Sequence, residues 1–341
     1  MKTLSFLCLV ILGILTVYPF QETFCAEKTT FINFGATQSS SAYFPPRVAI
    51  AKIINREVPE VRVTVVESGS TNDNAMRMIE GVFQMASGAV DTARDVYWGR
   101  DRWKDKRWTK MRLFSGLSEG RLLTYVRRDA AIRSFSDITG KPINPGFMGS
   151  DAEALSMKIF SALPEIKPVI VRGTMEDSMK NLSLGKIIGM VKQSPKKVYD
   201  SGMASVHVKI PLDIVGLSKQ QAEKVRAKFP EIAFSYISKG QYSESPMSGD
   251  FWVVGSINGH WVSSDIPEEL VYKMIKAVYE NYNEVIAAFA PAGWADPLKM
   301  VIEAAENASA EAFCPFHAGV VRYLREKGIR VPKILIPPEY K

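Results

Sequence analysis

The chain has 341 residues, of which 46% are hydrophobic and 23% charged, as in a globular protein long enough for two domains of about 100–200 residues each. Lysine and arginine number 43 against 36 aspartate and glutamate residues, so the net charge is +7. This excess does not favour nucleic-acid binding, because the densest basic stretch, residues 100–110, is interleaved with Asp101 and Asp105 and lies among tryptophans that we expect to pack inward.

Residues 1–25 have the pattern of a secretory signal peptide. A positively charged start precedes an almost unbroken apolar run, Leu4 to Val17, and small residues surround a cleavage point near Ala26. The run is shorter than the roughly 20 residues of a spanning helix, which argues against a membrane anchor. Lipidation of Cys25 is disfavoured because bulky Phe24 precedes it. We therefore expect a mature chain that works in the periplasm.

The first part of the mature chain alternates strands with helices. Thr30 to Phe34 is predicted as a strand, Arg47 to Glu57 as a helix and Val61 to Glu67 as a second strand. A turn over residues 69–74 then leads into a helix from Asn74 to Glu80. This alternation is typical of α/β units with a parallel sheet.

The middle of the chain repeats this alternation and is predicted to form a separate lobe. Arg121 to Val126 is predicted as a crossing strand, Ser134 to Lys141 as a short helix closed by glycine, and residues 144–151 as a turn. The elements expected next are a helix over Ala152 to Leu163, a strand over Val169 to Arg172, a helix over Met175 to Leu184, and a strand over Ile187 to Val191 that ends in a turn at Lys192 to Pro195.

The last part of the chain returns to the first lobe. Phe251 to Ile257 is predicted as a strand, and a long helix runs from Pro267 to Ala288 with Asp265 as its N-cap. Ala304 to Lys341 is helical and then proline-rich. We therefore expect lobe I to comprise residues 26–120 and 248–341, and lobe II to comprise residues 121–247, with a cleft between them.

Three hydroxyl-rich turns at helix starts suggest an anion site in this cleft. They lie at residues 37–45, 69–74 and 144–151. The free backbone N–H groups and the dipole of a helix N-terminus suit an anionic ligand. Serine and threonine are also ordinary helix caps, and capping explains any one of these turns by itself. Three turns from two lobes favour a shared site, because ligands of open α/β sheets bind beyond the carboxyl ends of the strands.

The predicted ligand-binding residues come from these turns and from the end of one strand. Tyr43 is expected as an aromatic wall of the pocket and Met148 as an apolar one. The complete set is Ser39, Ser40, Ser41, Tyr43, Ser70, Thr71 and Asn74 from lobe I, with Met148, Gly149, Ser150, Gln193 and Ser194 from lobe II.

Catalytic, metal and cofactor patterns are poorly supported. The chain has only three histidines and no Gly-x-Ser-x-Gly elbow, no phosphate loop and no dinucleotide glycine pattern. Cys314 and His317 offer two zinc ligands where a structural site needs four, so we expect a capping and packing role for this segment. The remaining cysteines lie in or beside the signal, which leaves no disulfide framework. We predict a protein that is not an enzyme and holds no metal or cofactor.

Several co-linear segments resemble the TAXI group of TRAP transporter solute receptors, over about Thr29 to Pro338. The segments that carry the resemblance are Ala42 to Pro45, Val58 to Val65 with Glu67 to Ser70, Asp91 with Tyr97 to Gly99, Ser134 to Lys141, Asn144 to Gly146 with Gly149 and Ser150, Asp265 to Glu268, and Phe316 to Gly328. The first turn departs from the family, because Thr37 to Ser41 replaces a glycine-rich turn. Residues 86–90, the apolar strand that leads to the family's acidic position at Asp91, depart from it as well. The identity of the ligand is therefore open.

The resemblance implies a two-lobed, type II periplasmic binding protein-like fold, in which each lobe is a mainly parallel sheet flanked by helices. It implies a monomeric receptor that closes on a small organic anion, a carboxylate or an amino acid, and delivers it to the membrane permease subunits of a TRAP transporter. Two alternatives remain open. A subunit that feeds a sensor kinase would share the same pocket, and a secreted hydrolase would need a serine within hydrogen-bond reach of His260 or His317.

Overall fold

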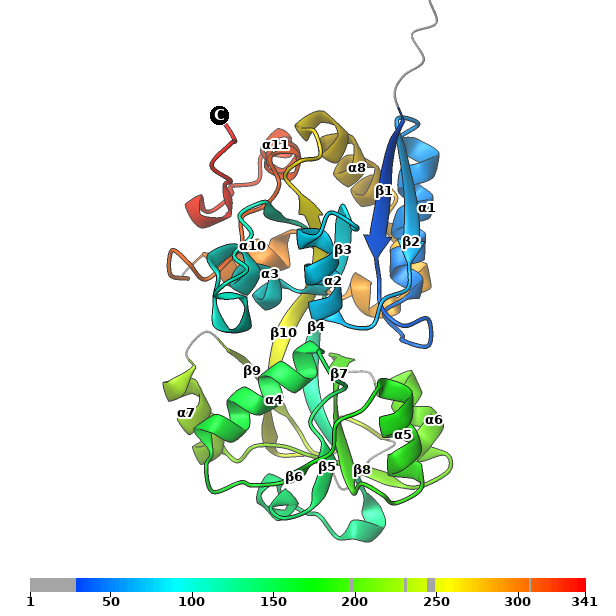
Figure 1. Ribbon diagram of the computed structural model, residues 1–341, viewed down its shortest axis with the longest axis vertical. Coiled ribbons are helices and arrows are strands. Elements are labelled where there is room, and N and C mark those ends of the chain that lie inside the picture. The colour runs from blue at the N-terminus through cyan, green and yellow to red at the C-terminus, as the bar shows by residue number, and fades with distance from the viewer. Residues whose placement is uncertain (1–28, 197–198, 230–231, 244–248, 307) are drawn as a thin grey trace, which may run out of the picture.

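The computed structural model describes residues 29–196, 199–229, 232–243, 249–306 and 308–341. Within these residues the chain forms two lobes of strands and helices, one above the other in Figure 1. The predicted signal peptide lies outside the described residues. In the described part, no helix is both long enough and apolar enough to cross a membrane.

Lobe I contains a mixed sheet with a parallel edge. β1 (Thr30–Gly35) pairs in parallel with β2 (Val61–Val66) and β3 (Met85–Ala89), and β3 pairs in antiparallel fashion with β10 (Phe251–Ser263). One large apolar core, which includes the fully buried Trp261, lies between this sheet and its helices. The helices of lobe I are α1 (Pro45–Glu57), α2 (Thr71–Ile79), α3 (Val90–Trp98), α8 (Glu268–Glu280), α9 (Tyr282–Ala288), α10 (Lys299–Ala305) and α11 (Ala318–Glu326).

Lobe II contains a sheet with a separate apolar core on each face. β5 (Pro142–Asn144) pairs in parallel with β6 (Val169–Ile170) and β7 (Gly189–Pro195). The helices of lobe II are α4 (Asp151–Ala162), α5 (Met175–Ser183), α6 (Ser201–His207) and α7 (Lys219–Lys228). α4 and α7 cover one core and α5 and α6 the other, on opposite sides of the sheet in Figure 1.

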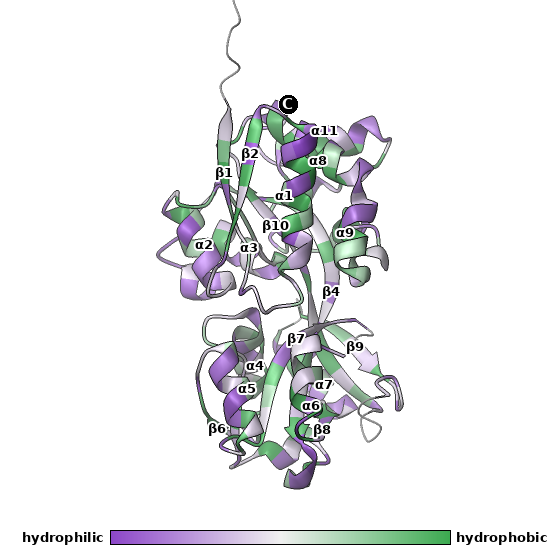
Figure 2. Cartoon of the chain, turned by 90° about the vertical axis from the view of Figure 1, so that its right-hand side faces the viewer, coloured by the Kyte–Doolittle hydropathy of each residue, from purple (hydrophilic) through white to green (hydrophobic). Residues whose placement is uncertain are grey.

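Two long strands belong to both lobes. β4 (Met111–Arg127) pairs with β10 as far as Gly120, and beyond that residue it pairs with β7 and β8 (Leu212–Val215). β10 pairs with β9 (Ala233–Ile237) in lobe II before it reaches β4. Figures 1 and 2 show these strands as the connection between the lobes. The predicted boundary at residues 120/121 falls inside β4, and the lobe boundaries stay a prediction.

Most predicted elements appear close to their expected bounds, but several expectations are wrong. β4 begins at Met111 rather than Arg121, and β7 runs on through the expected turn at Lys192 to Pro195. The first half of β4 is buried on both faces, so it lacks the polar alternation that would reveal a strand. The long helix is divided into α8 and α9 at Asn281, and its cap is Pro267, because Asp265 pairs with Lys110 at 3.0 Å instead.

The packing of α8 against α11 depends on a glycine. A Cβ atom at Gly319 would lie 2.5 Å from the Glu268 carbonyl oxygen and 2.5 Å from the Tyr272 nitrogen, both of which are backbone atoms that cannot rotate away. We predict that Gly319→Ala lowers the free energy of unfolding by about 1–3 kcal/mol in urea titrations, as overpacking does.

The matched control for this prediction is Gly69→Ala. A Cβ atom there meets only the Asp73 carboxylate, at 3.7 Å. Its effect should stay within about 0.5 kcal/mol. Equal stabilities for the two variants would contradict the close packing of α8 and α11.

Candidate functional site

The candidate site is a cavity of about 70 Å³ between the lobes. From lobe I it is lined by residues just after β1, at the start of α1 and α2, and in β3. From lobe II it is lined by the start of α4 and by β7, and Asn258 of β10 completes it. The cavity therefore lies beyond the carboxyl ends of β1 and β5, where ligands of α/β sheets bind. We call it the arginine cavity after Arg47, which forms part of its wall.

Arg47 is a buried cation without a carboxylate partner. It is 2% exposed and makes no ion pair with any described residue. Its Nη1 donates to the Tyr43 carbonyl oxygen, its guanidinium lies 5.4 Å from the centre of the Tyr43 ring, and its Nε has no hydrogen-bond partner. Burial lowers the pKa of Arg47 to about 10, although Tyr43 and Tyr282 raise it. The side chain is therefore positively charged at neutral pH, and its charge is not neutralised within the described chain.

Other buried polar atoms near the cavity also lack partners. The Tyr43 hydroxyl, the Ser118 hydroxyl and the Asn258 Nδ2 are buried and make no hydrogen bond with the described residues. Burial raises the pKa of Tyr43, so the phenol stays protonated and can donate. In contrast, Lys192 in the cavity wall is 2.5 Å from the Asp200 carboxylate, which neutralises it.

This arrangement suits an anion with two or more acceptor oxygens. Charge-assisted hydrogen bonds from a guanidinium to a carboxylate are shorter and stronger than neutral ones, and the planar guanidinium matches the carboxylate in shape. Leaving a buried donor unpaired costs about 1–3 kcal/mol, and a ligand that accepts from Arg47 and Tyr43 would recover that free energy.

Five of the predicted binding residues line the arginine cavity. Ser41, Tyr43 and Thr71 come from lobe I, and Ser150 and Gln193 come from lobe II. The structure thus brings together the first hydroxyl turn and the turn around residue 150. Contact with a ligand stays a prediction for these five residues.

The other seven are not among the residues that line this cavity, and several have structural roles. Ser39 bonds to Glu67 through its backbone nitrogen and its hydroxyl, and Ser40 is exposed. Met148 is 63% exposed, and its backbone nitrogen donates to the Gly173 oxygen. Its role as an apolar pocket wall stays a prediction.

The remaining four make contacts within the protein. Ser70 caps α2, and the Gly149 carbonyl accepts from Asn72. Ser194 bonds to the Tyr125 hydroxyl at 2.8 Å. Asn74 is 1% exposed and its Nδ2 donates to the carbonyl oxygens of Ala36 and Ser87, both at 2.8 Å, so that it joins β3 to the chain just after β1.

Sequence reasoning missed Arg47 as a site residue, although the sequence contains a signal for it. Arg47 is in helical register with Ile50, Ala51 and Ile54, which form the buried face of α1. A charged residue on an apolar face at the start of a helix indicates a buried charge that needs a partner. Asn258 and Lys192 lie inside long buried strands, where the local sequence gives no comparable signal.

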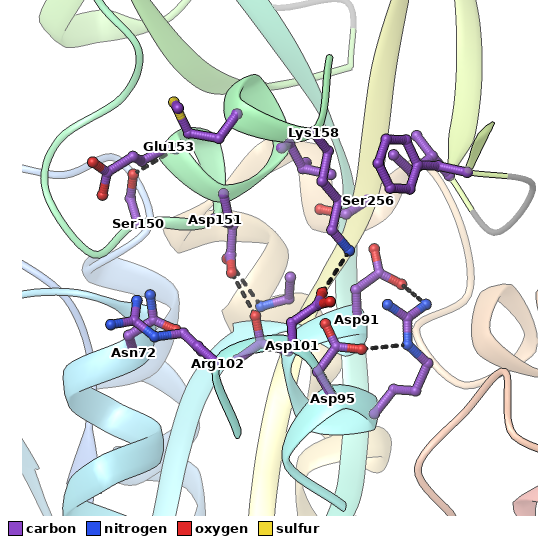
Figure 3. A pocket seen from close by; sticks show the side chains of 18 of the residues that line it. Asn72, Asp91, Asp95, Asp101, Arg102, Ser150, Asp151, Glu153, Lys158 and Ser256 are labelled. Atoms are coloured by element: carbon purple, nitrogen blue, oxygen red, sulfur yellow. Dashed lines mark hydrogen bonds and ion pairs between the residues drawn. The ribbon is translucent and has the colours of Figure 1, made fainter. Parts of the chain in front are cut away.

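A larger cavity of about 560 Å³ lies beside the first, between α3 and α4, and we call it the lateral cavity (Figure 3). Several of its charges are paired within the protein. Arg94 pairs with Asp95 at 2.8 Å and with Asp91 at 3.4 Å, and Lys158 pairs with Asp101 at 3.0 Å. Partial burial raises the pKa of Asp91 to about 6, against the lowering effect of Arg94. No group of three or more potential ligands among the described residues could hold a metal ion.

A serine–histidine pair is present but lies in the core. The Ser115 hydroxyl is 2.9 Å from His260 Nδ1, and the two residues are 3% and 0% exposed. Burial lowers the pKa of His260 well below its usual value. Neither residue is among those that line the two cavities. His317 Nδ1 accepts from the Gly319 backbone nitrogen and so caps α11, while its Nε2 donates to the Ile266 carbonyl oxygen at 3.0 Å. The geometry therefore gives no support to a hydrolase.

Comparison with known proteins identifies the family. A profile of the NMT1-like family matches residues 34–328, which is most of the chain. The chain belongs to the NMT1-like family. No curated protein sequence matches this NMT1-like chain.

Solved structures of solute-binding proteins have a similar fold. A putative L-cystine ABC transporter protein from Listeria monocytogenes has a TM-score of 0.50 at 11% identity, covering 79% of this chain and 99% of that one. An ancestral arginine-binding protein bound to arginine has a TM-score of 0.49 at 14% identity, covering 77% and 99%. A TctC solute binding protein from Polaromonas has a TM-score of 0.46 at 12% identity, covering 77% and 88%. At 11% identity the likeness to the Listeria protein concerns the fold alone, and it confirms the predicted two-lobed α/β architecture.

The position of Asn74 in this NMT1-like protein predicts a structural role. Asn74→Leu should lower the free energy of unfolding by about 2–4 kcal/mol, because two buried carbonyl groups lose their donor. Ser39→Ala, at an exposed position, should change it by no more than about 0.5 kcal/mol. If Asn74→Leu instead kept full stability and only weakened ligand binding, the residue would be a ligand contact, as first predicted.

The buried histidine at the start of α11 predicts acid sensitivity. Burial lowers the pKa of His317 to about 4, whereas the unfolded chain protonates near the usual value of about 6.5. The unfolded state therefore binds more protons below pH 6.5, and stability falls as the pH drops toward 4. Between pH 7 and pH 5 the loss from His317 should reach about 2 kcal/mol in urea titrations.

The control for this acid sensitivity is His317→Asn, which keeps an N-cap acceptor but does not titrate. It should show a smaller loss of stability between pH 7 and pH 5 than the unmodified protein. The same loss in both proteins would assign the acid sensitivity to other groups.

Proposed function

We propose that this protein is an extracytoplasmic solute-binding receptor that captures a small organic anion between its lobes. The observation that carries the proposal is the charge of Arg47, which is buried in the cavity wall and has no carboxylate partner among the described residues. Burying an uncompensated charge is costly, so proteins keep such groups where a ligand completes them. The unpaired Tyr43 hydroxyl and Asn258 amide add neutral donors for the same ligand.

Binding works by closure of the lobes around the β4–β10 connection. Arg47 and Tyr43 hold the anion on lobe I, and Ser150 and Gln193 of lobe II reach it when the lobes approach. Closure removes water from the charge-assisted hydrogen bonds and so strengthens them. The register of β4 and β10 is irregular after Asn258 and His260, where β10 also pairs with β3 of lobe I, so the strands bend close to the point where they pass between the lobes.

The ligand is a compact carboxylate or amino acid. A cavity of about 70 Å³ leaves room for only a few non-hydrogen atoms. An amino acid would also need an acceptor for its ammonium group. The carboxylate of Asp151 lines the cavity, accepts from the Thr71 hydroxyl and makes no ion pair with a described lysine or arginine, so it is the acceptor on offer. A panel that contains both classes decides between them.

The partner we propose is the membrane permease of a TRAP-type transporter, with this chain as a member of the TAXI group. The support is the co-linear set of segments described from the sequence, together with the NMT1-like family and the two-lobed fold. The N-terminal pattern supports delivery to the periplasm. A gene for a large multi-spanning permease beside this one would support a transport role over a sensor role.

The test of this proposal is ligand-induced thermal stabilisation of the mature protein, beginning near Ala26, with small monocarboxylates, dicarboxylates and amino acids. At least one anion should raise the melting temperature. Arg47→Met should weaken its binding by at least about tenfold, because a charge-assisted hydrogen bond is lost. The same variant should unfold at the same or a higher melting temperature without ligand, because it removes an uncompensated buried charge.

The matched control is Arg62→Met, which removes an exposed arginine of β2 that does not line either cavity. It should bind the anion like the unmodified protein. If Arg47→Met also keeps full affinity, or if no anion in the panel stabilises the unmodified protein, the proposal is wrong.

A further inference from the structure

Asp151 connects the two lobes and separates their two cavities. It is the first residue of α4 in lobe II and is 9% exposed. Figure 3 shows its carboxylate pointing from α4 toward lobe I. Ser150 and Asp151 are the residues that line both the arginine cavity and the lateral cavity. The carboxylate therefore forms part of the wall between a small cavity and a much larger one.

Within the described residues, the Asp151 side chain accepts hydrogen bonds from lobe I alone. Its Oδ1 accepts from the Thr92 hydroxyl at 2.7 Å. Its Oδ2 accepts from the Thr71 hydroxyl at 2.9 Å and from the Ala89 backbone nitrogen at 3.3 Å. These donors come from the start of α2, the end of β3 and the first turn of α3. A single side chain of lobe II thus bonds to three separate elements of lobe I.

Two further contacts between the lobes flank Asp151 on α4. The Asn72 backbone nitrogen and Nδ2 donate to the Gly149 carbonyl oxygen, at 3.3 and 2.6 Å. Lys158 of α4 pairs with Asp101 of lobe I at 3.0 Å. All the groups in these contacts of Gly149, Asp151 and Lys158 belong to the protein, so the contacts can form whether or not a ligand is bound.

We propose that Asp151 is a specificity-determining residue that clasps the lobes together through Thr71, Thr92 and Ala89, and that it restricts the ligand to the arginine cavity. The clasp stands independently of any ligand, whereas the restriction of ligand size rests on the proposed function. With the carboxylate in place, an anion held by Arg47 cannot extend into the lateral cavity. Without it, the two cavities join.

The favourable and unfavourable contributions of the Asp151 contacts to the free energy of closure are close in size, which suits a receptor that must open. Closure takes the Asp151 carboxylate out of water, and this burial raises its pKa, while the bonds from Thr92, Thr71 and Ala89 lower it. The cost of desolvation and the gain from three donors thus oppose each other. Removing the donors but leaving the carboxylate should therefore disturb closure more than removing the carboxylate itself.

The first test measures the distance between the lobes without any ligand. Spin labels at Glu80→Cys on lobe I and Lys180→Cys on lobe II report this distance by pulsed electron resonance, since both positions are exposed and Cys314 is buried. The labelled protein should show a main population at short distance. Thr71→Val with Thr92→Val should lower the closed-to-open ratio by at least about tenfold, and Asp151→Ala should lower it by less.

The control is Thr64→Val, at an exposed position of β2 that lines neither cavity. It should leave the distance distribution unchanged. An unchanged distribution in both the Asp151 variant and the double threonine variant would overturn the clasp. So would a predominantly open distribution in the protein that carries only the labels.

The second test compares anions of increasing size by calorimetry. Asp151→Ala should weaken the smallest binding anion by up to about tenfold, because closure is less favourable, and should improve binding of longer homologues relative to it. Tighter binding of all the anions to the Asp151 variant would show that the carboxylate competes with the ligand. An unchanged order of affinities would show that the carboxylate sets no size limit. Either result overturns the proposal. If no anion binds to any variant while the lobe distances respond as expected, the clasp stands and the proposed function fails.

Discussion

The structure depends on one constraint, which is that β4 and β10 run through both lobes within one continuous sheet. Each strand completes the sheet of lobe I with one half and pairs with strands of lobe II with the other. The lobes therefore cannot move apart without bending the same pair of strands. This connection fixes which sides of the lobes face each other, so that the starts of α1 and α2 always meet the start of α4. The arginine cavity, the lateral cavity and the contacts of Asp151 all follow from that alignment.

The two buried charges at the centre of the cleft, Arg47 and Asp151, differ in whether the protein supplies their partners. Arg47 is buried with neither a carboxylate nor a partner for its Nε, whereas Asp151 is buried with three donors. Arg47 is thus a cation whose charge only a molecule from outside the described chain can neutralise. Asp151 is an anion satisfied through contacts that exist only when the lobes are together. The unpaired cation and the contacts between the lobes therefore lie on separate side chains.

The sequence predicted the elements with clear periodicity and missed those without it. β1, α1 and β2 have apolar patterns bounded by turn residues, and they appear close to their expected bounds. The first half of β4 is buried on both faces, so no alternation marks it. The polar residues Lys192 to Ser194 resembled a turn, because the partners of Gln193 and Ser194 lie far away in the chain. Of the site, the hydroxyl turns were predictable from helix starts. Arg47 was not recognised, because its environment depends on tertiary packing, although its register with Ile50 was visible.

The order of the strands has a consequence for how the chain folds. β3 of lobe I pairs with β10, which follows it by well over a hundred residues, while the strands between them belong largely to lobe II. A chain made from its N-terminus thus presents β1 to β3 with an incomplete sheet edge until residues 251–263 have been added. Contacts between distant segments form slowly, and unpaired strand edges are prone to aggregate. The early part of lobe I is therefore the segment that waits longest for its partner strand and most needs protection during synthesis.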